Sequence, residues 1–252
     1  MEEKTMTTKR ISLFCSILLI GFGLIGTTWA SPKQPGEMDH KKMTSGIHWL
    51  GHDSFRIEAD GLMIYIDPFQ IKEGPKADLI LITHDHRDHC SPEDVAKIQK
   101  PETIIITVSQ AAAKLSGQIK IIKPGEELTI KGIPIKAIPA YNINKFRSPG
   151  VPFHPKESGY VGFMLTVKGL RLYHAGDTDF IPEMKGLSPD VALLPVSGIY
   201  VMTAEEAVEA AGAINPKLAI PMHVGGPVGS PGMADRFKEK ATVPSLILPL
   251  ER

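Results

Sequence analysis

Cysteine is scarce in this chain. Only Cys15 and Cys90 occur among the 252 residues, and Cys15 lies in an N-terminal apolar segment that we expect to be removed. A mature chain with one cysteine excludes an intramolecular disulfide, even in an oxidising compartment. We expect Cys90 to act as a small apolar residue at the start of a helix, with metal tuning or oxidative sensitivity as the alternative.

The sequence also lacks an excess of charge of either sign. Its 28 basic residues balance 28 acidic ones, and no polybasic run occurs. Strong attraction to nucleic acid or to an anionic membrane surface is therefore not indicated. There is no internal repeat and no low-complexity tract, so the composition favours one globular domain.

A long apolar run is absent as well. The apolar segment 11–25 is shorter than the about 20 residues that a transmembrane helix needs. Basic residues precede it, and the small residues that a signal peptidase reads end at Ala30. This order is typical of a secretory signal peptide over residues 1–30. We expect export to the periplasm or the medium without a stable membrane span after cleavage, and an uncleaved membrane anchor is the alternative.

Residues 31–45 are polar, contain Pro32, Pro35 and Gly36, and are expected to form a linker to one domain over residues 46–252. In this domain, short strand patterns alternate with turns and helix signals. The expected strands are 47–50, 54–59, 62–66, 79–83, 104–108, several within 119–140, 160–167, 171–174, 191–195 and 218–221. The expected helices begin near 92 and cover 109–115, 204–214 and 233–240, and 141–158 is expected to be a long loop. The pattern predicts a layered α/β domain.

Residues 83–89, Thr-His-Asp-His-Arg-Asp-His, carry the strongest chemical signal. They place His84, His86, Asp88 and His89 directly after the apolar strand pattern 79–82. Neutral imidazole is the commonest protein ligand for zinc, and a nearby carboxylate suits a second metal ion or a water molecule. The spacing therefore predicts a metal site rather than a solvated turn.

This motif resembles the H-x-H-x-D-H signature of the metallo-β-lactamase superfamily, whose fold is a four-layer αββα sandwich. Asp177 and His223, each following an expected strand, match the later aspartate and histidine of that family. Segments 49–55 and 66–69 resemble the metal-dependent hydrolases related to ascorbate-phosphate lactonase and N-acylphosphatidylethanolamine phospholipase D. The resemblance covers about residues 47–249 and implies the same fold here.

The resemblance implies one metal ion held by His84, His86 and a third histidine, and a second held by Asp88, His89 and His223, with Asp177 bridging. The family's third histidine is missing from segment 138–142, so we assign this position to His154 on the long loop. The alternatives are a site completed by water or holding one metal ion, and Asn142 as a weaker ligand.

The implied function is hydrolysis of an ester-like bond, most readily a phosphodiester or lactone, by a hydroxide held on two divalent metal ions. Zinc is expected, with Mn²⁺ or Fe²⁺ as alternatives, and Asp88 is the expected catalytic residue, orienting the hydroxide or passing a proton. The alternatives are an iron-dependent oxidoreductase on the same fold and a non-catalytic metal-binding module. The expected partner is a small molecule, while the oligomeric state stays open.

Further residues have expected supporting roles. Asp67 and Thr83 are expected to hydrogen-bond metal-binding imidazoles. His174 is expected to be structural, and His52 either reaches the rim of the site or stabilises its turn. An anionic substrate could contact the loop residues Tyr141, Lys145, Arg147 and Lys156, which are otherwise ordinary solvated polar groups.

Overall fold

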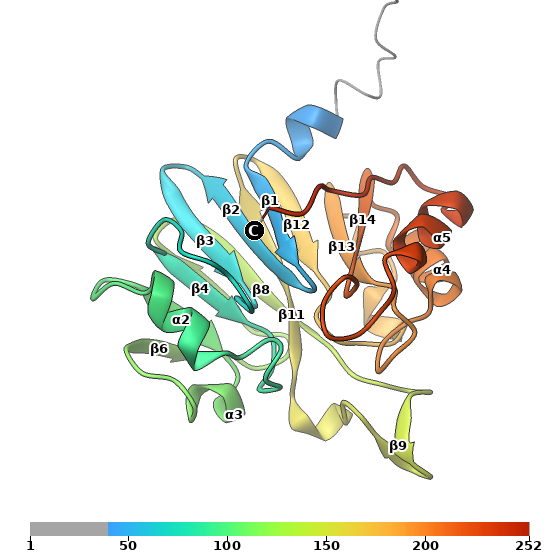
Figure 1. The fold of residues 1–252 in the computed structure, drawn as a ribbon, viewed down its shortest axis with the longest axis horizontal. Helices are drawn as coiled ribbons and strands as arrows, with labels where there is room; N and C mark the ends of the chain where they lie inside the picture. The colour runs from blue at the N-terminus through green and yellow to red at the C-terminus, as the bar shows by residue number, and fades with distance from the viewer. Residues whose placement is uncertain (1–39, 252) are drawn as a thin grey trace, which may run out of the picture. The chain divides into compact units, whose positions relative to one another are not determined.

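Two six-stranded sheets form the centre of the domain (Figure 1). This computed structural model describes residues 40–251, so the predicted signal peptide and most of the predicted linker lie outside the described residues. The first sheet has the order β1 (Ile47–Gly51), β2 (Ser54–Ala59), β3 (Leu62–Ile66), β4 (Leu79–Ile82), β5 (Ile104–Thr107) and β6 (Gln118–Ile121). The second has the order β14 (Leu218–Met222), β13 (Val191–Pro195), β12 (Leu170–His174), β11 (Val161–Val167), β8 (Ile133–Pro139) and β7 (Glu127–Ile130).

Helices cover the outer sides of this pair of sheets. α2 (Pro92–Ile98) and α3 (Ser109–Ala112) lie beside the first sheet, and α4 (Ala204–Ile214) and α5 (Gly232–Lys240) lie beside the second (Figure 1). Among the described residues, a short helical segment over 40–43 precedes β1, and two short 3₁₀ helices, η1 (Lys156–Ser158) and η2 (Pro182–Met184), lie in the loops of the second half. The predicted four-layer αββα sandwich is confirmed.

Local sequence explains where these elements begin. The Ser91 side chain accepts a hydrogen bond from the Asp94 backbone N–H and caps α2, whose first turn contains Pro92. Thr203 and Glu206 form a capping box at α4. β4 lies between the parallel strands β3 and β5, and all four of its residues are buried, which explains its uninterrupted apolar sequence.

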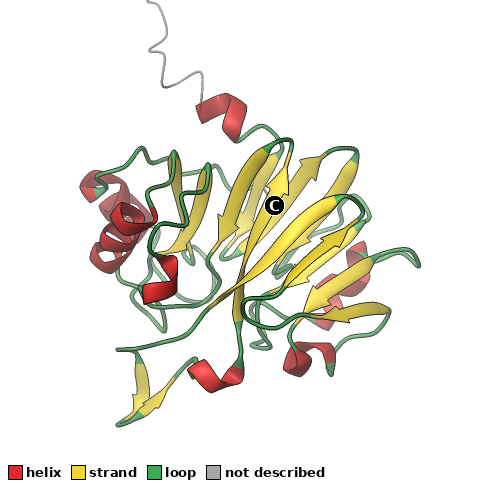
Figure 2. Cartoon of the chain, turned by 180° about the vertical axis from the view of Figure 1, so that it is seen from behind, coloured by secondary structure: helices red, strands yellow, loops and turns green. Residues whose placement is uncertain are grey.

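The segment 141–158, predicted to be a loop, is more ordered than expected. It contains the hairpin β9 (Phe146–Ser148) and β10 (Val151–Pro152), followed by η1, and the hairpin extends away from the two large sheets (Figures 1 and 2). Strands of three and two residues are too short to show an alternating pattern, and the proline and glycine between them indicated only a turn. The helix predicted over 109–115 is also shorter, because it ends at Ala112.

Several strand ends meet at one end of the sandwich. Parallel pairing places the carboxyl ends of β3 and β4 together, and likewise those of β12, β13 and β14. The β1–β2 turn lies at the same end as the β3 terminus, because β2 is antiparallel to β3. Loops from both sheets therefore meet over this end. Among residues 40–251, no helix is long and apolar enough to cross a membrane.

Candidate metal centre

Five segments bring histidine and aspartate side chains together where the strand ends meet. The residues that form the metal-ligand groups come from the β1–β2 turn, the turn after β4, the loop after β10, the turn after β12 and the end of β14, and they are His52, Asp53, His84, His86, Asp88, His89, His154, Asp177 and His223. All seven metal ligands predicted from the sequence are among them. His52 and Asp53 are additional.

The first group consists of His84, His86 and His154, whose ligand atoms lie within 4.8 Å of one another. His86 Nδ1 and His154 Nε2 are 3.2 Å apart. His154 is fully buried although its loop follows the projecting hairpin. The structure therefore places the loop histidine beside the two motif histidines.

Asn142 explains how His154 is held in this position. The amide oxygen of Asn142 accepts hydrogen bonds from the backbone N–H of His154 and from its ring Nδ1, both at 2.9 Å. The amide nitrogen donates to the Asp179 carboxylate and to the Tyr200 carbonyl. Asn142 is thus a partner of the imidazole and does not take the ligand position considered as an alternative.

The second group is built around Asp177. Its Oδ1 lies 3.3 Å from His89 Nε2, and its Oδ2 lies 3.4 Å from His223 Nε2. The same Oδ2 is 3.4 Å from His154 Nε2 and 4.0 Å from His84 Nε2. One carboxylate therefore lies between both groups of histidines.

Hydrogen bonds at the opposite ring nitrogens set the orientation of the buried imidazoles. His84 Nδ1 lies 2.9 Å from Thr83 Oγ1, and His89 Nδ1 lies 2.8 Å from Asp67 Oδ2. His223 Nδ1 lies 2.8 Å from Ser197 Oγ. Thr83 Oγ1 itself donates to Asp67, so it accepts from His84. Each Nδ1 is then the donor, and each Nε2 directs its lone pair into the cluster. The structure places Asp67 and Thr83 as the sequence predicted.

The cluster fits bound metal ions. The buried atoms His84 Nε2, His89 Nε2, His223 Nε2 and Asp177 Oδ1 have no hydrogen-bond partner, which is costly unless a cation satisfies them. Metal–ligand bonds of about 2.0–2.2 Å in a tetrahedral site separate ligand atoms by roughly 3.3–3.6 Å. The separations of 3.2–3.4 Å among His86, His154, His89, His223 and Asp177 match this spacing.

Burial and mutual charge shift the protonation of the cluster. Burial lowers the pKa of His84 well below its ordinary value and that of His154 to about 4, so both stay neutral and able to ligate. Burial alone would raise the pKa of Asp177, but His89 and His223 hold it well below its usual range. Burial disfavours charge on His89, yet Asp177 raises its pKa well above the ordinary value. The ionised carboxylate thus attracts cations into the cluster.

His52 and Asp53 were not predicted as ligands. His52 has a left-handed backbone with φ of 53°, and its Nε2 lies 3.1 Å from Asp88 Oδ2. Both carboxylate oxygens of the fully buried Asp53 lack hydrogen-bond partners, and burial raises the pKa of this residue. The Gly-His-Asp turn between two expected strands was the only sequence signal for them. His52 therefore reaches the site, as one of its two expected roles required.

Three of the four loop residues considered for anion binding form ion pairs or hydrogen bonds with acidic residues of the same chain. Lys145 pairs with Glu206 at 2.7 Å, and Lys156 pairs with Glu183 at 2.9 Å. Tyr141 also hydrogen-bonds Glu183. The guanidinium of Arg147 lies over the ring of Phe153.

The remaining two assignments concern buried side chains near the site. His174 Nε2 lies 2.9 Å from the Asp53 carbonyl, and its Nδ1 accepts from the Gly176 N–H, so it supports the backbone. Cys90 is buried beside the carbonyl of Ala111. Burial raises the pKa of its thiol to about 11. The expectation of a small apolar residue describes this environment.

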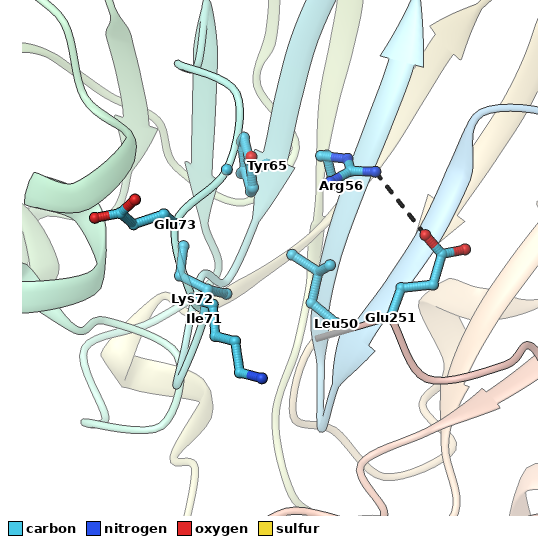
Figure 3. Close-up of a pocket in the computed structure, with 8 residues that line it drawn as sticks. Leu50, Arg56, Tyr65, Ile71, Lys72, Glu73 and Glu251 are labelled. Atoms are coloured by element: carbon cyan, nitrogen blue, oxygen red, sulfur yellow. Dashed lines mark ion pairs between the residues drawn. The ribbon is translucent and has the colours of Figure 1, made fainter.

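A small cavity elsewhere in the domain is separate from the cluster. It has a volume of about 90 Å³ and is lined by residues of β1, β2, β3 and the segment after β3 (Figure 3). Arg56 and Glu251 form an ion pair at its wall, at 3.9 Å. None of the clustered histidines lines this cavity, so the chemistry lies at the strand ends.

An αββα sandwich with histidine and aspartate ligands gathered at the strand ends defines the class of metal-dependent hydrolases with the metallo-β-lactamase fold. The chain belongs to this superfamily: the family model described as "Beta-lactamase superfamily domain" matches residues 46–223. The predicted superfamily is therefore confirmed. The narrower resemblance to ascorbate-phosphate lactonase stays a prediction.

Several proteins support the same assignment. A UPF0173 metal-dependent hydrolase of Thermoplasma acidophilum is 35% identical over 195 residues, covering 70% of this chain and 82% of the relative. One of Methanopyrus kandleri is 32% identical, covering 71% and 84%. A crystal structure from Parabacteroides distasonis, named as a metal-dependent hydrolase, has a TM-score of 0.71 at 35% identity, covering 81% of this chain and 93% of that one. The protein is thus a metal-dependent hydrolase.

A more distant structure shares the fold alone. CmlA, a diiron β-hydroxylase from Streptomyces venezuelae, has a TM-score of 0.59 at 13% identity, covering 80% of this chain and 52% of that chain.

Proposed function

We propose that the protein is a dinuclear zinc hydrolase that cleaves an ester-like bond of a small molecule, with phosphodiesters and lactones as the favoured substrates. The observation that carries the two-metal proposal is the position of Asp177, whose Oδ2 lies 3.4 Å from Nε2 of both His154 and His223. A carboxylate shared by two histidine groups is suited to joining two metal ions. Zinc is favoured because the donors are mainly imidazoles.

When bound, the metal ions would supply Lewis-acid chemistry, polarising the carbonyl or phosphoryl oxygen and activating water. The side chains hold this site in place. Hydrogen bonds at the Nδ1 atoms of the imidazole rings fix the ring orientation. The partners are Asp67, Thr83, Ser197 and Asn142. The other clustered side chains are buried, whereas His86 and Asp88 remain partly exposed.

Asp88 is the residue best placed to move a proton. Its side chain is 27% exposed, and its Oδ2 lies 3.1 Å from His52 Nε2. Burial opposes ionisation of Asp88, but the hydrogen bond from His52 keeps its pKa well below the ordinary value. Its position supports proton transfer from water to the leaving group, because Asp88 is partly exposed beside the histidines and His52 fixes its direction.

A substrate panel tests this function. The purified protein would be assayed against bis(4-nitrophenyl) phosphate, aliphatic lactones and a chromogenic β-lactam, with metal analysis of the same sample. We expect zinc near two equivalents and chelator-sensitive hydrolysis of a phosphodiester or a lactone. Bound zinc without chelator-sensitive turnover on any substrate would contradict the proposal. Tightly bound iron with oxygen consumption would favour the alternative of an iron-dependent oxidoreductase. This alternative is supported only by the shared fold with the diiron enzyme CmlA.

We also propose that the protein is exported. The support is the order of basic, apolar and small residues over 1–30, which lies outside the described residues. N-terminal sequencing of the protein from its native cells should begin at Ser31. A protein that begins at its initiator methionine and sediments with membranes would instead support the uncleaved anchor.

A further inference from the structure

A cavity of about 520 Å³ adjoins the metal-ligand cluster at Asp88. Its walls come from the segment after β3, the turn after β4, the first turns of α2 and the glycine-rich segment 225–229. This volume is within the range of about 300–1,000 Å³ for small-molecule sites. Because Asp88 belongs to both the cluster and the cavity wall, a molecule in this cavity would lie beside the reacting centre.

Most charges that line the cavity are already compensated. Asp94 accepts a hydrogen bond from Gln70 N–H and pairs with Lys97 at 2.7 Å. Lys97 also donates to the Ile71 carbonyl. Two charged groups that line the cavity have no hydrogen-bond or ion-pair partner in the described part of the chain: Glu93 in the first turn of α2, and Arg87, the neighbour of Asp88.

Arg87 is thus the uncompensated cation nearest along the chain to the proposed catalytic carboxylate. It is exposed, whereas His84 and His89 on either side of its turn are buried. The segment therefore divides its side chains between the metal cluster and the cavity. A guanidinium presents a planar set of donors that matches a carboxylate or phosphate.

The cavity also has an apolar part of its lining. It consists of Phe69, Pro227 and Val228. Phe69 lies with its ring centroid 6.2 Å from that of His52, and its backbone N–H donates to Ser54 Oγ. Phe69 is therefore tied to the β1–β2 turn that carries His52.

Glycine allows the segment with Pro227 and Val228 to approach the cluster so closely. A Cβ at Gly226 would lie 3.0–3.1 Å from side-chain atoms of His52, and one at Gly229 would lie 2.6 Å from the His223 carbonyl oxygen. Gly229 also has a φ of +81°, which side chains disfavour. A side chain at either position would push this segment, which contains Val228, away from the cluster.

We infer that this cavity is the substrate cleft, that Arg87 binds an anionic group of the substrate, and that Phe69 and Val228 pack against a compact apolar part. The inference rests on the proposed hydrolase function and specifies its substrate class: an ester-like molecule that carries a carboxylate or phosphate together with an aromatic or short aliphatic group. Neutral esters would lack the contact with Arg87 and react less efficiently.

Binding of phenylacetate tests the anion contact without requiring turnover. Its dissociation constant would be measured by calorimetry on the zinc-loaded protein, with 2-phenylethanol as the neutral probe. We expect Arg87→Ala to weaken phenylacetate binding by ~10-fold or more, as for loss of a charge-assisted hydrogen bond, and to leave 2-phenylethanol unchanged. Arg87→Lys should retain part of the affinity, and Glu93→Gln should bind phenylacetate at least as tightly as the wild type.

Lys120→Ala is the matched control, because it removes one positive charge from an exposed position on β6. It should bind phenylacetate like the wild type. Equal binding by Arg87→Ala and the wild type, an equal loss in Lys120→Ala, or no measurable binding to the wild type would each overturn the assignment of Arg87.

A kinetic comparison links the same residue to the reaction. The substrates are 4-acetoxybenzoate and the neutral ester phenyl acetate, which differ by one carboxylate. Phenyl acetate is the phenyl ester of acetic acid and is distinct from the phenylacetate anion used in the binding test. Arg87→Ala should lower kcat/KM for 4-acetoxybenzoate by ~10-fold or more while leaving phenyl acetate unchanged. Equal losses for both esters would reject the anion contact. Absence of hydrolysis with intact, Arg87-dependent phenylacetate binding would reject the hydrolase function and retain the anion site.

Discussion

Replacing Asn142 with alanine should damage the metal centre without removing any ligand. In the wild type, the amide oxygen accepts hydrogen bonds from the backbone N–H and the Nδ1 of His154, both at 2.9 Å. His154 is fully buried, so both donors would lose their acceptor away from solvent. Each unsatisfied buried donor costs ~1–3 kcal/mol, so the free energy of unfolding should fall by about 2–6 kcal/mol, less where water enters the space.

The metal affinity should fall together with the stability. Partners of ligating histidines contribute ~10–100-fold to metal affinity. Competition with a chromophoric chelator should therefore show one zinc equivalent weakened by this factor in Asn142→Ala, with the other equivalent less affected. Asn144→Ala is the control, because Asn144 is exposed and its amide bonds Glu206 at the surface. Unchanged zinc affinity in Asn142→Ala would refute the role given to Asn142 in orienting His154.

Three further predictions concern protonation and hydrogen bonding around the centre. Zinc should bind more tightly as pH rises and release protons on binding, because Asp177 raises the pKa of His89 and His223 in the metal-free cluster against the opposing effect of burial. Calorimetry in buffers of different ionisation enthalpy would measure the number of protons released. Zinc binding without proton release would contradict this prediction. Asp67→Asn should lower zinc affinity ~10–100-fold. In the wild type, the hydroxyl of Thr83 and the Nδ1 of His89 meet Asp67 Oδ2 at 2.6 and 2.8 Å, and a neutral amide would replace the charged acceptor of both. An unchanged zinc affinity would argue against this. Cys90 should resist alkylation at pH 8 in the folded protein, since burial raises its pKa to about 11, and peptide mass spectrometry showing rapid modification of the native protein would oppose this.

Much of the fold could be predicted from sequence because its signals are local. The apolar run of β4, the cap at Ser91 and the capping box at Thr203 each depend on neighbouring residues, and their elements lie where expected. The hairpin β9–β10 was missed because strands of two and three residues leave no periodic pattern.

The metal ligands divide in the same way. His84, His86, Asp88 and His89 share one turn, so spacing alone was enough to predict a metal site there. His154 could be assigned only by the absence of a nearer histidine. The role of Asn142 and the position of Asp53 in the cluster depend on contacts between separate segments, such as the 2.9 Å bond from His154 to Asn142, and no local pattern encodes such contacts.

The most direct test of a two-metal hydrolase is a zinc titration of turnover. The purified protein would be stripped with a chelator and reloaded stepwise, while hydrolysis of the best substrate from the panel is followed. Asp177 joins the two histidine groups, so activity should rise until about two equivalents of zinc are bound, and Asp177→Ala should bind zinc weakly and stay inactive. Full activity at one equivalent, or hydrolysis that survives complete removal of metal, would contradict the account.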